Sequence, residues 1–336
     1  MDAAPAVSVL VPILNEEEHL EDSLALMRGQ DPPGGLEILA VDGGSTDRTP
    51  EILARVAAED PRVRVLANPA RLIPNALNIG LRAARGEYVA RMDAHTWYPA
   101  DYLARGIERL GRGDVAWVSG PQLAEGRGRW SRRVALALST PMGFGGASFR
   151  YAQEEIEVDS GFTGVWRRET LIQHGGWDEG WPINEDGELA ARIRAAGGRI
   201  VCVPEMAARY VPRDSLRGLA RQYWRYGQYR AKTARHRPGG MRRSHVLPPG
   251  LVLAAVAGVL PGPQRRAARA GVAAWACGLA ATAARAAARG APARDAAALP
   301  AVLATMHVAW GAGFLLGCAR FGPPVAALAR LARGAR

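Results

Sequence analysis

The first 120 residues alternate short apolar runs with segments of helical pattern, and no other feature of the chain limits its fold as strongly. Runs rich in β-branched residues predict strands over residues 7–14, 36–41, 63–66, 88–92 and 115–119. The segments between them predict helices over residues 16–28, 49–58, 74–85 and 99–110. Strands with few polar residues are typically buried on both faces, and helices of this length connect parallel strands. The sequence therefore predicts an α/β fold with a mostly parallel, doubly wound sheet.

The pattern is less regular after this region. Residues 121–158 are rich in Gly, Arg and Ser and indicate a loop-bearing insertion. A short helix near residues 169–174, a helix over 184–196 and a strand over 200–203 follow. We therefore expect a first domain over residues 1–212.

The chain changes character beyond residue 212. Residues 213–245 form a basic segment, and residues 215–236 within it have the spacing of an amphipathic helix suited to a membrane surface. Three apolar stretches follow, at residues 246–260, 271–288 and 299–319. The last has 21 residues without a formal charge, and a helix needs about 20 apolar residues to cross a bilayer. We expect membrane-associated helices with two or three spans over residues 246–336, although Ala-rich helices of a soluble bundle would give a similar pattern.

The charge of the chain is divided between these two parts. Residues 207–336 hold 21 Lys and Arg against two Asp and Glu, whereas residues 1–206 hold 22 against 30. A nucleic-acid binder carries its basic residues on the folded domain, so this division argues against nucleic acid as a partner. Arginines beside the apolar stretches favour the cytoplasmic side of a cell membrane for the first domain. The N-terminus lacks the pattern of a signal peptide, and three widely spaced cysteines fit a reducing compartment.

Polar residues stand at the carboxyl ends of three predicted strands, where open α/β sheets bind ligands. Asn15 and Glu16 follow the first strand, and Asp42 ends the second, where it could accept a hydrogen bond from a nucleotide base or ribose. Asp93 and His95 follow the fourth strand. In an extended backbone their side chains would point to the same face. They could then hold a divalent cation that bridges two phosphates.

A pair of carboxylates, Glu185 and Asp186, begins the helix predicted over residues 184–196. One interpretation is an acidic first turn favoured by the helix dipole. The other is that one carboxylate is a general base that deprotonates an incoming hydroxyl. Because adjacent helical residues face different directions, only one of the two should act as base. Trp177 and Trp181 precede the pair and could stack on a sugar in an acceptor site.

Four motifs in this order resemble family-two glycosyltransferases with the GT-A fold: VSVLVPILNEEE, AVDGGSTDRT, RMDAH and NEDGELAARI. The resemblance covers about residues 5–212. The apolar tail and the QYWRYG segment are most similar to bacterial exopolysaccharide glucosyltransferases of the succinoglycan type. The resemblance implies that Pro12, Asn15 and Glu16 line the nucleotide pocket and that Asp42 recognises the base.

The resemblance also implies roles for the other motifs. Asp93 and His95 occupy the positions of the family's metal-binding D-x-D, with His95 in place of the second Asp, and Asp93 contacts the donor. Asp186 matches the acidic residue that the family uses as base, with Glu185 beside it. The QYWRY run is similar to the Q-x-x-R-W motif of processive synthases, which implies acceptor contacts. These acceptor residues are Gln222, Arg225 and Tyr226.

The resemblance implies an inverting glycosyltransferase that uses a nucleotide-diphosphate sugar, UDP-linked in our interpretation, with Mn²⁺ or Mg²⁺ as cofactor. The expected acceptor is a polyprenyl-linked saccharide in exopolysaccharide or cell-envelope glycan synthesis, and membrane lipids are expected partners. The few predicted spans favour addition of single sugars over polymerisation through a channel. Two alternatives stay open: transfer to a polyprenyl phosphate, as in dolichol-phosphate-mannose synthases, and a non-catalytic, membrane-anchored nucleotide-sugar-binding scaffold.

Overall fold

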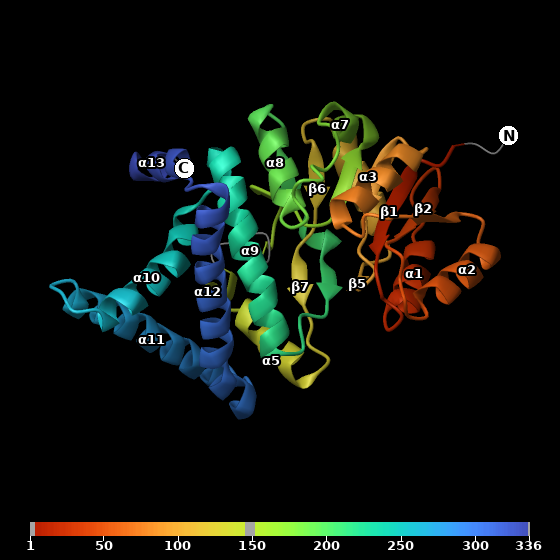
Figure 1. Cartoon of the computed structure of the whole chain (residues 1–336). Helices are drawn as coiled ribbons and strands as arrows, with labels where there is room; N and C mark the ends of the chain where they lie inside the picture. The colour runs from red at the N-terminus through yellow and green to blue at the C-terminus, as the bar shows by residue number, and fades with distance from the viewer. Residues whose placement is uncertain (1–3, 145–151, 335–336) are drawn as a thin grey trace. The chain divides into compact units, whose positions relative to one another are not determined.

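The structure is a computed structural model that describes residues 4–144 and 152–334. The chain divides into two compact units, and Figure 1 labels many of their elements. Unit 1 comprises the chain up to Leu123 and from Ser148 to Tyr210, and unit 2 comprises Ala124 to Ala147 and Val211 onward. Residues 124–144 thus group with the C-terminal helices, although the sequence pattern places them inside the first domain. Residues 213–245 and 246–336, expected as separate segments, both fall in unit 2.

A mixed sheet forms the centre of unit 1. Within the described residues its strands are β1 (Val7–Ile13), β2 (Leu36–Asp42), β3 (Val63–Ala67), β4 (Tyr88–Arg91), β6 (Trp117–Ser119), β8 (Ile156–Glu157), β9 (Gly164–Arg167) and β10 (Ile200–Cys202). Their order is β3-β2-β1-β4-β9-β6-β10-β8. β1 pairs in parallel with β2 and β4, β2 with β3, and β10 with β6, while β9 runs antiparallel between β4 and β6. The predicted α/β fold is confirmed.

Both faces of this sheet are covered because alternate residues of each strand point to opposite sides. Val7, Val9 and Val11 pack in one core with side chains of α1, α2 and α4, whereas Leu10 and Leu39 pack in a second core with α3, α7 and α8. This arrangement explains the nearly continuous apolar runs of the sequence. The bounds of these helices are α1 (Leu20–Arg28), α2 (Thr49–Glu59), α3 (Ile73–Ala83), α4 (Tyr102–Gly111), α7 (Arg168–Gln173) and α8 (Glu185–Ala195).

A second, small sheet and a short helical segment occupy regions that the sequence pattern left irregular. The sheet has the order β5-β11-β7, with bounds β5 (Thr96–Trp97), β11 (Ala208–Tyr210) and β7 (Gln122–Ala124), and η2 (Pro204–Met206) precedes β11. The predicted loop-bearing insertion contains α5 (Arg129–Leu138) and α6 (Pro141–Phe144), and its residues 145–151 lie outside the described residues. The sequence pattern did not predict α5 because its exposed arginines obscure the period of its apolar face. Val134, Ala137 and Leu138 form that face.

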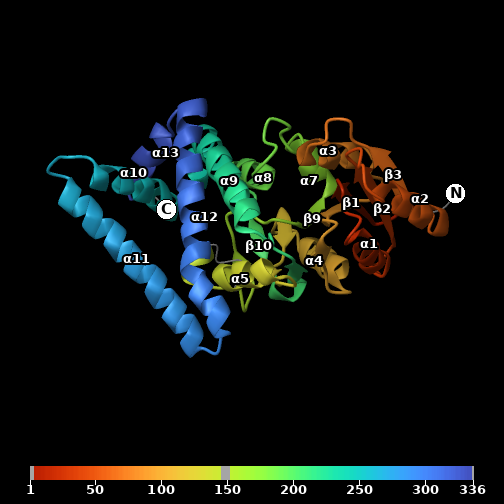
Figure 2. The same cartoon turned by 60° about the horizontal axis from the view of Figure 1, so that its bottom comes forward.

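Unit 2 is helical in the part of the chain that the structure describes. After α5 and α6 it contains α9 (Leu216–His236), η3 (Pro238–Gly240), η4 (Arg243–Val246), α10 (Leu247–Val259), α11 (Arg265–Ala288), α12 (Ala293–Phe321) and α13 (Val325–Ala332). By overall length and mean hydropathy alone, α11 and α12 suit a membrane crossing, and α10 is shorter. Both long helices begin before their apolar stretches because Ala and Arg are good helix formers. Figure 2 shows α9 lying alongside α12, and α10 and α11 joined as a hairpin.

Candidate active site

The carboxyl ends of β2, β1 and β4 lie side by side at one edge of the large sheet. The chain passes from β1 to β2 and β3 on one side and returns to β4 on the other, so the strand order reverses between β1 and β4. Open α/β sheets bind ligands in the crevice at such a point. The structure therefore brings predicted donor-binding and metal-binding residues to one edge. The donor-binding residues are Asn15, Glu16, Asp42 and Asp93, and the metal-binding residues are Asp93 and His95.

Hydrogen bonds join the loop after β1 to the loop after β2. The Asn15 N–H donates to Ser45 Oγ at 2.8 Å, and the Thr46 N–H donates to Asn15 Oδ1 at 2.8 Å. Asn15 has a left-handed backbone with φ of 54°, a conformation that asparagine tolerates better than most residues. Ser45 Oγ–H in turn donates to Asp42 Oδ1 at 2.6 Å. Because α1 begins only at Leu20, Asn15 fixes these two loops and does not cap that helix.

A contact between the loops after β1 and β4 spans the point where the strand order reverses. His95 Nδ1 and Glu16 Oε1 are 3.1 Å apart, and 42% and 22% of their side chains are exposed. β4 ends at Arg91 and the chain then turns, so Asp93 contacts Arg91 while His95 contacts Glu16. The prediction that Asp93 and His95 share one face of an extended strand is therefore wrong. Pro12 lies nearby in sequence, half-buried in β1.

Arg91, at the end of β4, is 2% exposed and donates hydrogen bonds to three carboxylates. Its Nε donates to Asp93 Oδ1 at 2.8 Å. Its Nη1 donates to Glu185 Oε1 at 2.9 Å and to Asp186 Oδ1 at 2.9 Å. We call Arg91, Asp93, Glu185 and Asp186 the Arg91 cluster. It joins the predicted metal-binding motif to the predicted base, although the two are far apart in sequence.

Arg91 is a candidate site residue that the sequence motifs did not include. A signal for it exists, because residues two apart in a strand share a face. Arg91 is the only charged residue of the strand YVAR and stands two positions before Asp93. A single arginine in a buried strand requires a partner, since a buried unpaired charge is costly. That reasoning leads to Asp93, but it does not identify the carboxylates of α8.

The start of α8 directs two side chains into this cluster. Asn184, just before the helix, has a left-handed backbone with φ of 63°. Glu185 and Asp186, the first two helical residues, are 6% and 7% exposed, and both reach Nη1 of Arg91. The expectation that these adjacent residues face different directions is wrong at this helix start. Their contacts with a guanidinium also go beyond what an acidic first turn needs.

The cluster places three buried carboxylates around one guanidinium. Burial raises the pKa of Asp186 well above its ordinary value, and the single Arg91 charge does not offset burial together with repulsion from Glu185 and Asp93. Burial alone would lower the pKa of Arg91, but the three carboxylates raise it well above the ordinary value. Arg91 therefore stays charged, and Asp186 binds a proton more readily than an exposed aspartate does. This is the direction that suits a general base.

Glu16 and His95 have ligand chemistry that fits a divalent cation whose other ligands a bound diphosphate would supply. Among the described residues no group of three or more His, Cys, Asp and Glu side chains is arranged to hold a metal ion. Glu16 and His95 nevertheless offer a carboxylate and an imidazole 3.1 Å apart, both partly exposed. Oxygen and imidazole ligands suit Mn²⁺, and Mg²⁺ sites commonly use few protein carboxylates together with substrate phosphates. Asp93 lies further inside, with both oxygens bonded to Arg91.

The two tryptophans expected to stack on an acceptor sugar are buried. Trp177 is 1% exposed and packs edge-on against Trp166, with ring centroids 5.7 Å apart. The backbone N–H of Trp177 donates to Asn78 Oδ1 at 2.9 Å, and Asn78 Nδ2 donates back to the Trp177 carbonyl at 2.8 Å. Trp181 is 7% exposed. The stacking role predicted for both is wrong, because a sugar needs an open ring face; Trp177 instead fixes the segment that leads to α8.

The predicted acceptor residues of the QYWRY run lie on α9, in unit 2. Arg225 is exposed, as is Tyr226 at 38%. Gln222 Nε2 donates to the Tyr226 hydroxyl at 2.9 Å, so these two side chains form a pair on successive turns of the helix. The helix places all three residues within five positions, where they can serve one ligand.

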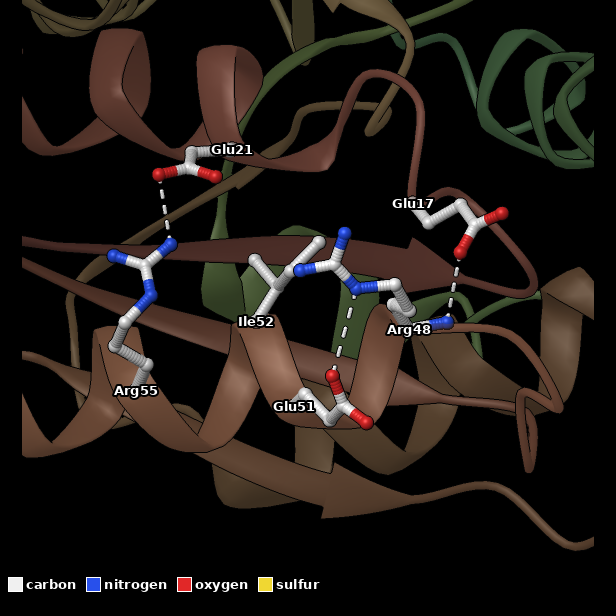
Figure 3. A pocket seen from close by; sticks show the side chains of 6 residues that line it. All are labelled: Glu17, Glu21, Arg48, Glu51, Ile52 and Arg55. Carbon is white, nitrogen blue, oxygen red and sulfur yellow. Dashed lines mark hydrogen bonds and ion pairs between the residues drawn. The ribbon is translucent and has the colours of Figure 1, made fainter.

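A separate hollow of about 430 Å³ lies between α1 and α2 (Figure 3). Its lining is charged, but the charges pair with one another: Arg55 Nη2 with Glu21 Oε1 at 2.7 Å and Arg48 Nε with Glu51 Oε2 at 3.6 Å. The Arg48 N–H also donates to Glu17 Oε2 at 2.9 Å. The hollow contains no member of the Arg91 cluster. We attribute no function to it.

Comparison with known proteins gives consistent matches. A sequence model of the family described as Glycosyl transferase family 2 matches residues 8–175. The succinoglycan biosynthesis protein ExoA of Rhizobium meliloti (strain 1021) is 36% identical over 227 residues, which cover 67% of this chain and 68% of that protein. A relative from Methanococcus voltae is 26% identical over 233 residues, which cover 66% of this chain and 71% of that protein. Its name is dolichyl N-acetyl-alpha-D-glucosaminyl phosphate 3-beta-D-2,3-diacetamido-2,3-dideoxy-beta-D-glucuronosyltransferase.

A solved structure is similar over most of the chain. The mannosyltransferase PcManGT from Pyrobaculum calidifontis, in complex with GDP-Man and Mn²⁺, superposes with a TM-score of 0.55 and 25% sequence identity. The match covers 95% of this chain and 87% of that protein. The similarity therefore extends beyond the family match, which ends before Glu185 and Asp186.

Proposed function

Because the chain belongs to glycosyltransferase family 2, we propose that it is an inverting transferase that moves a sugar from a UDP-sugar to a polyprenyl-linked saccharide. The setting would be exopolysaccharide or cell-envelope glycan synthesis. A relative named for succinoglycan biosynthesis supports the setting, and a relative named for transfer to a dolichyl-linked saccharide supports the acceptor. The observation that carries the mechanism is the Arg91 cluster, in which one guanidinium holds Asp93 and Asp186 together.

The donor would bind across the loops after β1, β2 and β4. Asp42 would accept a hydrogen bond from the base, and Pro12 and Asn15 would line the nucleotide pocket. The loop hydrogen bonds of Asn15 and Asp42 support this role, since they hold both side chains in place before a ligand arrives.

The diphosphate would lie towards Glu16, Asp93 and His95. Glu16 and His95 would hold Mn²⁺ or Mg²⁺, which when bound stabilises negative charge on the leaving diphosphate. The pairing of Glu16 with His95 across the point where the strand order reverses supports this position. The neighbouring structure that contains GDP-Man and Mn²⁺ shares the fold and supports a cation-assisted donor site.

Asp186 would act as the general base. The acceptor hydroxyl oxygen forms a bond to the anomeric carbon from the face opposite the diphosphate, while the bond from that carbon to the diphosphate oxygen breaks. The hydroxyl proton passes to Asp186, whose pKa is raised mainly by burial. Arg91 would hold Asp186 at a fixed distance from Asp93, and therefore from the leaving group. Configuration at the anomeric carbon inverts because there is one displacement.

The acceptor lipid places the enzyme at a membrane, and we propose that unit 1 lies on the cytoplasmic side of the cell membrane, where nucleotide sugars are found. Gln222, Arg225 and Tyr226 would contact the acceptor. The basic character of α9 supports this role, because a polyprenyl-linked saccharide carries a diphosphate or phosphate.

The test is a transfer assay with purified full-length protein, a membrane lipid extract and labelled UDP- and GDP-sugars. We expect label to move from one UDP-sugar into a lipid-linked saccharide whose anomeric configuration is opposite to that of the donor. Transfer from a GDP-sugar would correct the donor, and a product containing only polyprenyl phosphate and one sugar would replace the acceptor. The absence of transfer from every donor, in a protein that binds one of them, would support a non-catalytic scaffold.

A further inference from the structure

Other helices of unit 2 cover α12, although its length and apolarity suit a membrane span. In its most apolar window 39% of the residues are buried, against 6% for α11. A side chain at Gly311 would overlap the Pro248 carbonyl at the start of α10. The indole N–H of Trp275 in α11 donates to His307 Nδ1 in α12 at 3.0 Å. α12 is therefore the central helix of unit 2.

α9 packs along α12 in the same direction. A Cβ at Gly313 would overlap the Trp224 carbonyl oxygen, and a Cβ at Gly317 would meet the Gln228 carbonyl oxygen. Further along both helices, the rings of Tyr229 and Phe321 have centroids 5.9 Å apart. Contacts that advance together along two helices mean parallel packing, and the glycines allow the backbones to approach closely. Both views show the two helices side by side (Figures 1 and 2).

α9 cannot cross a membrane. Six of its 21 residues are Lys or Arg, and no stretch of it longer than four residues lacks one of them. Arg217, Arg221, Arg225 and Arg235 are exposed. A helix of this length would measure about 31 Å and would therefore carry several charges through the hydrocarbon layer. Both ends of α9 must consequently lie on the same side of a bilayer.

The two ends of α12 are attached to the two ends of α9. At the beginning, Asp214 just before α9 accepts hydrogen bonds from the N–H groups of Trp130 and Ser131 in α5, at 2.7 and 2.6 Å. Two residues further along α5, Arg133 pairs with Asp295 in the first turn of α12 at 3.0 Å. At the far end, Arg235 of α9 donates to the carbonyl of residue 323, just after α12, at 3.1 Å. α12 therefore begins and ends on one side of the membrane.

α10 and α11 are too short in their apolar parts to cross as a pair. α10 has 13 residues, about 20 Å at 1.5 Å per residue. Between Arg269 and Arg285, α11 has 15 residues without a charge, about 23 Å. Both fall short of a hydrocarbon core of about 30 Å. The first turn of α11 also carries Arg265 and Arg266, which favour the headgroup level.

The hairpin of α10 and α11 instead has the properties of a helix pair that lies in one leaflet. Large apolar side chains of α10 are exposed, with Leu247 at 73%, Leu253 at 56% and Val259 at 77%. Arginines stand at both ends of each helix. Unit 2 as a whole contains 24 Lys and Arg against three Asp and Glu, which complements an anionic lipid surface. An apolar face bordered by basic residues is typical of interfacial helices.

We propose that unit 2 is monotopic: α10 and α11 insert into one leaflet of an anionic bilayer, and no helix of the unit crosses it. This departs from the two or three crossings that hydropathy predicts, because hydropathy does not register that α9 covers α12. The proposal does not depend on the transfer reaction. Sugar transfer could therefore fail to appear while the membrane arrangement holds, or the reverse.

Cysteine labelling of the full-length protein tests the proposal. In a background with Cys277→Ala and Cys318→Ala, and with the buried Cys202 left in place, single cysteines replace Gln264, Ala288 or Ala326. These positions lie in the connection between α10 and α11, at the end of α11 and on α13. Glu51→Cys on α2, where the side chain is 75% exposed, reports the side of unit 1. Each variant is treated with a membrane-impermeant maleimide in spheroplasts and in inverted vesicles of the expression host.

We expect all four cysteines to react from the same side, the cytoplasmic one. Reaction of the cysteine at 288 only from the opposite side would show that α11 and α12 cross, and reaction at 264 only from the opposite side would show that α10 and α11 cross. Either result overturns the proposal.

Flotation with lipid vesicles tests the lipid face itself. The wild-type protein and the double variant Leu253→Asn/Val259→Asn are mixed with phosphatidylcholine vesicles containing about 30% phosphatidylglycerol. We expect the double variant to bind at least about 10-fold more weakly, because two apolar side chains leave the leaflet. The control is Ile172→Asn on α7, which removes an apolar side chain of similar exposure, 54%, from unit 1 and should leave binding unchanged. Equal binding by the double variant and the wild type would overturn the proposal, as would equal binding to vesicles without phosphatidylglycerol.

Discussion

The guanidinium of Arg91 donates a hydrogen bond of 2.9 Å to each carboxylate oxygen of Asp186, 95 residues further along the chain. Through Nε the same guanidinium donates to Asp93 at 2.8 Å. One buried cation thus sets the distance between the end of β4 and the start of α8. In the proposed reaction these are the positions of the leaving group and of the base.

Replacing Arg91 with Lys tests this positioning role. Lysine keeps the charge but has no planar fork, so it cannot hold Asp93 and Asp186 at once. We expect a folded protein whose kcat falls about 100-fold, since a small misplacement of catalytic groups has an effect of that size. The KM for the donor should change much less, because the substitution leaves the residues proposed to bind the nucleotide, Pro12, Asn15 and Asp42, in place. Steady-state kinetics at varied donor concentration, with a thermal melt of each protein, makes the measurement.

Arg91→Met is the companion variant, because it leaves three buried carboxylates without their cation. We expect the free energy of unfolding to fall by about 3–5 kcal/mol. A melting temperature within experimental error of the wild type would contradict the buried cluster. Wild-type kcat in Arg91→Lys would remove the positioning role while leaving the fold intact.

Asp186→Asn separates the base from an acidic first turn. If Asp186 accepts the acceptor proton, the amide cannot replace it, and the transfer rate should fall by about 10²–10⁴-fold. Donor affinity should be preserved. Glu185→Gln is the matched control, because its carboxylate reaches the same Nη1 of Arg91 and its loss disturbs the cluster similarly. Turnover and donor affinity are measured side by side, and a greater loss in Glu185→Gln would move the role one residue back.

The cation is tested by chelation and by two variants of its proposed ligands. Transfer should stop in excess EDTA and return with Mn²⁺. His95→Ala and Glu16→Gln should each raise the Mn²⁺ concentration for half-maximal activity by about 10-fold, within the range seen when residues that support a metal site are changed. The structure adds Glu16 to this test, since its carboxylate lies 3.1 Å from the imidazole. Full activity in EDTA would exclude the metal role for both residues.

The sequence predicted the fold of unit 1 because its signals are local. β1, β2 and β4 have few polar residues, and the helices between them have the ordinary period, so the order of elements follows from patterns of about ten residues. α5 escaped prediction because arginines occupy much of its surface. The packing of α9 on α12 could not be predicted either, since it depends on Gly313 and Gly317 meeting a helix about 90 residues earlier.

The candidate site was predicted in part, for a similar reason. The residues at strand ends, such as Asp42 and Glu16, follow from the rule that parallel strands present their carboxyl ends at one edge. The contact of Arg91 with α8 depends on tertiary structure and left no periodic signal. Trp177 was misassigned because a tryptophan that follows two glycines gives no local indication of whether its ring is covered.

Glu37 provides a test of the fold that is independent of catalysis. It lies on β2, is 1% exposed, and accepts hydrogen bonds from Ser8 Oγ at 2.8 Å, from Arg64 Nη1 at 2.9 Å and from Arg85 Nε at 2.9 Å. Burial raises the pKa of Glu37, but the backbone N–H of Arg85 and these side-chain donors outweigh it, so the pKa lies below its ordinary value of 4.5.

A carboxylate whose pKa is lower in the folded than in the unfolded state stabilises the fold above the unfolded pKa, and this stability is lost as the pH falls through the folded pKa. Glu37→Gln should therefore unfold more easily at pH 7, by about 1–3 kcal/mol, because donors to a charged group lose their acceptor charge. The difference should shrink as the pH falls below about 4.5, where wild-type Glu37 itself begins to bind a proton on unfolding. Thermal melts of both proteins between about pH 7 and pH 3, followed by tryptophan fluorescence, measure this difference in stability.

The control is Glu59→Gln, which removes the carboxylate of an exposed ion pair with Arg55. It should change stability by less than about 1 kcal/mol at every pH. A melting difference between wild type and Glu37→Gln that stays constant over this range would show that Glu37 contributes through packing and not through its charge.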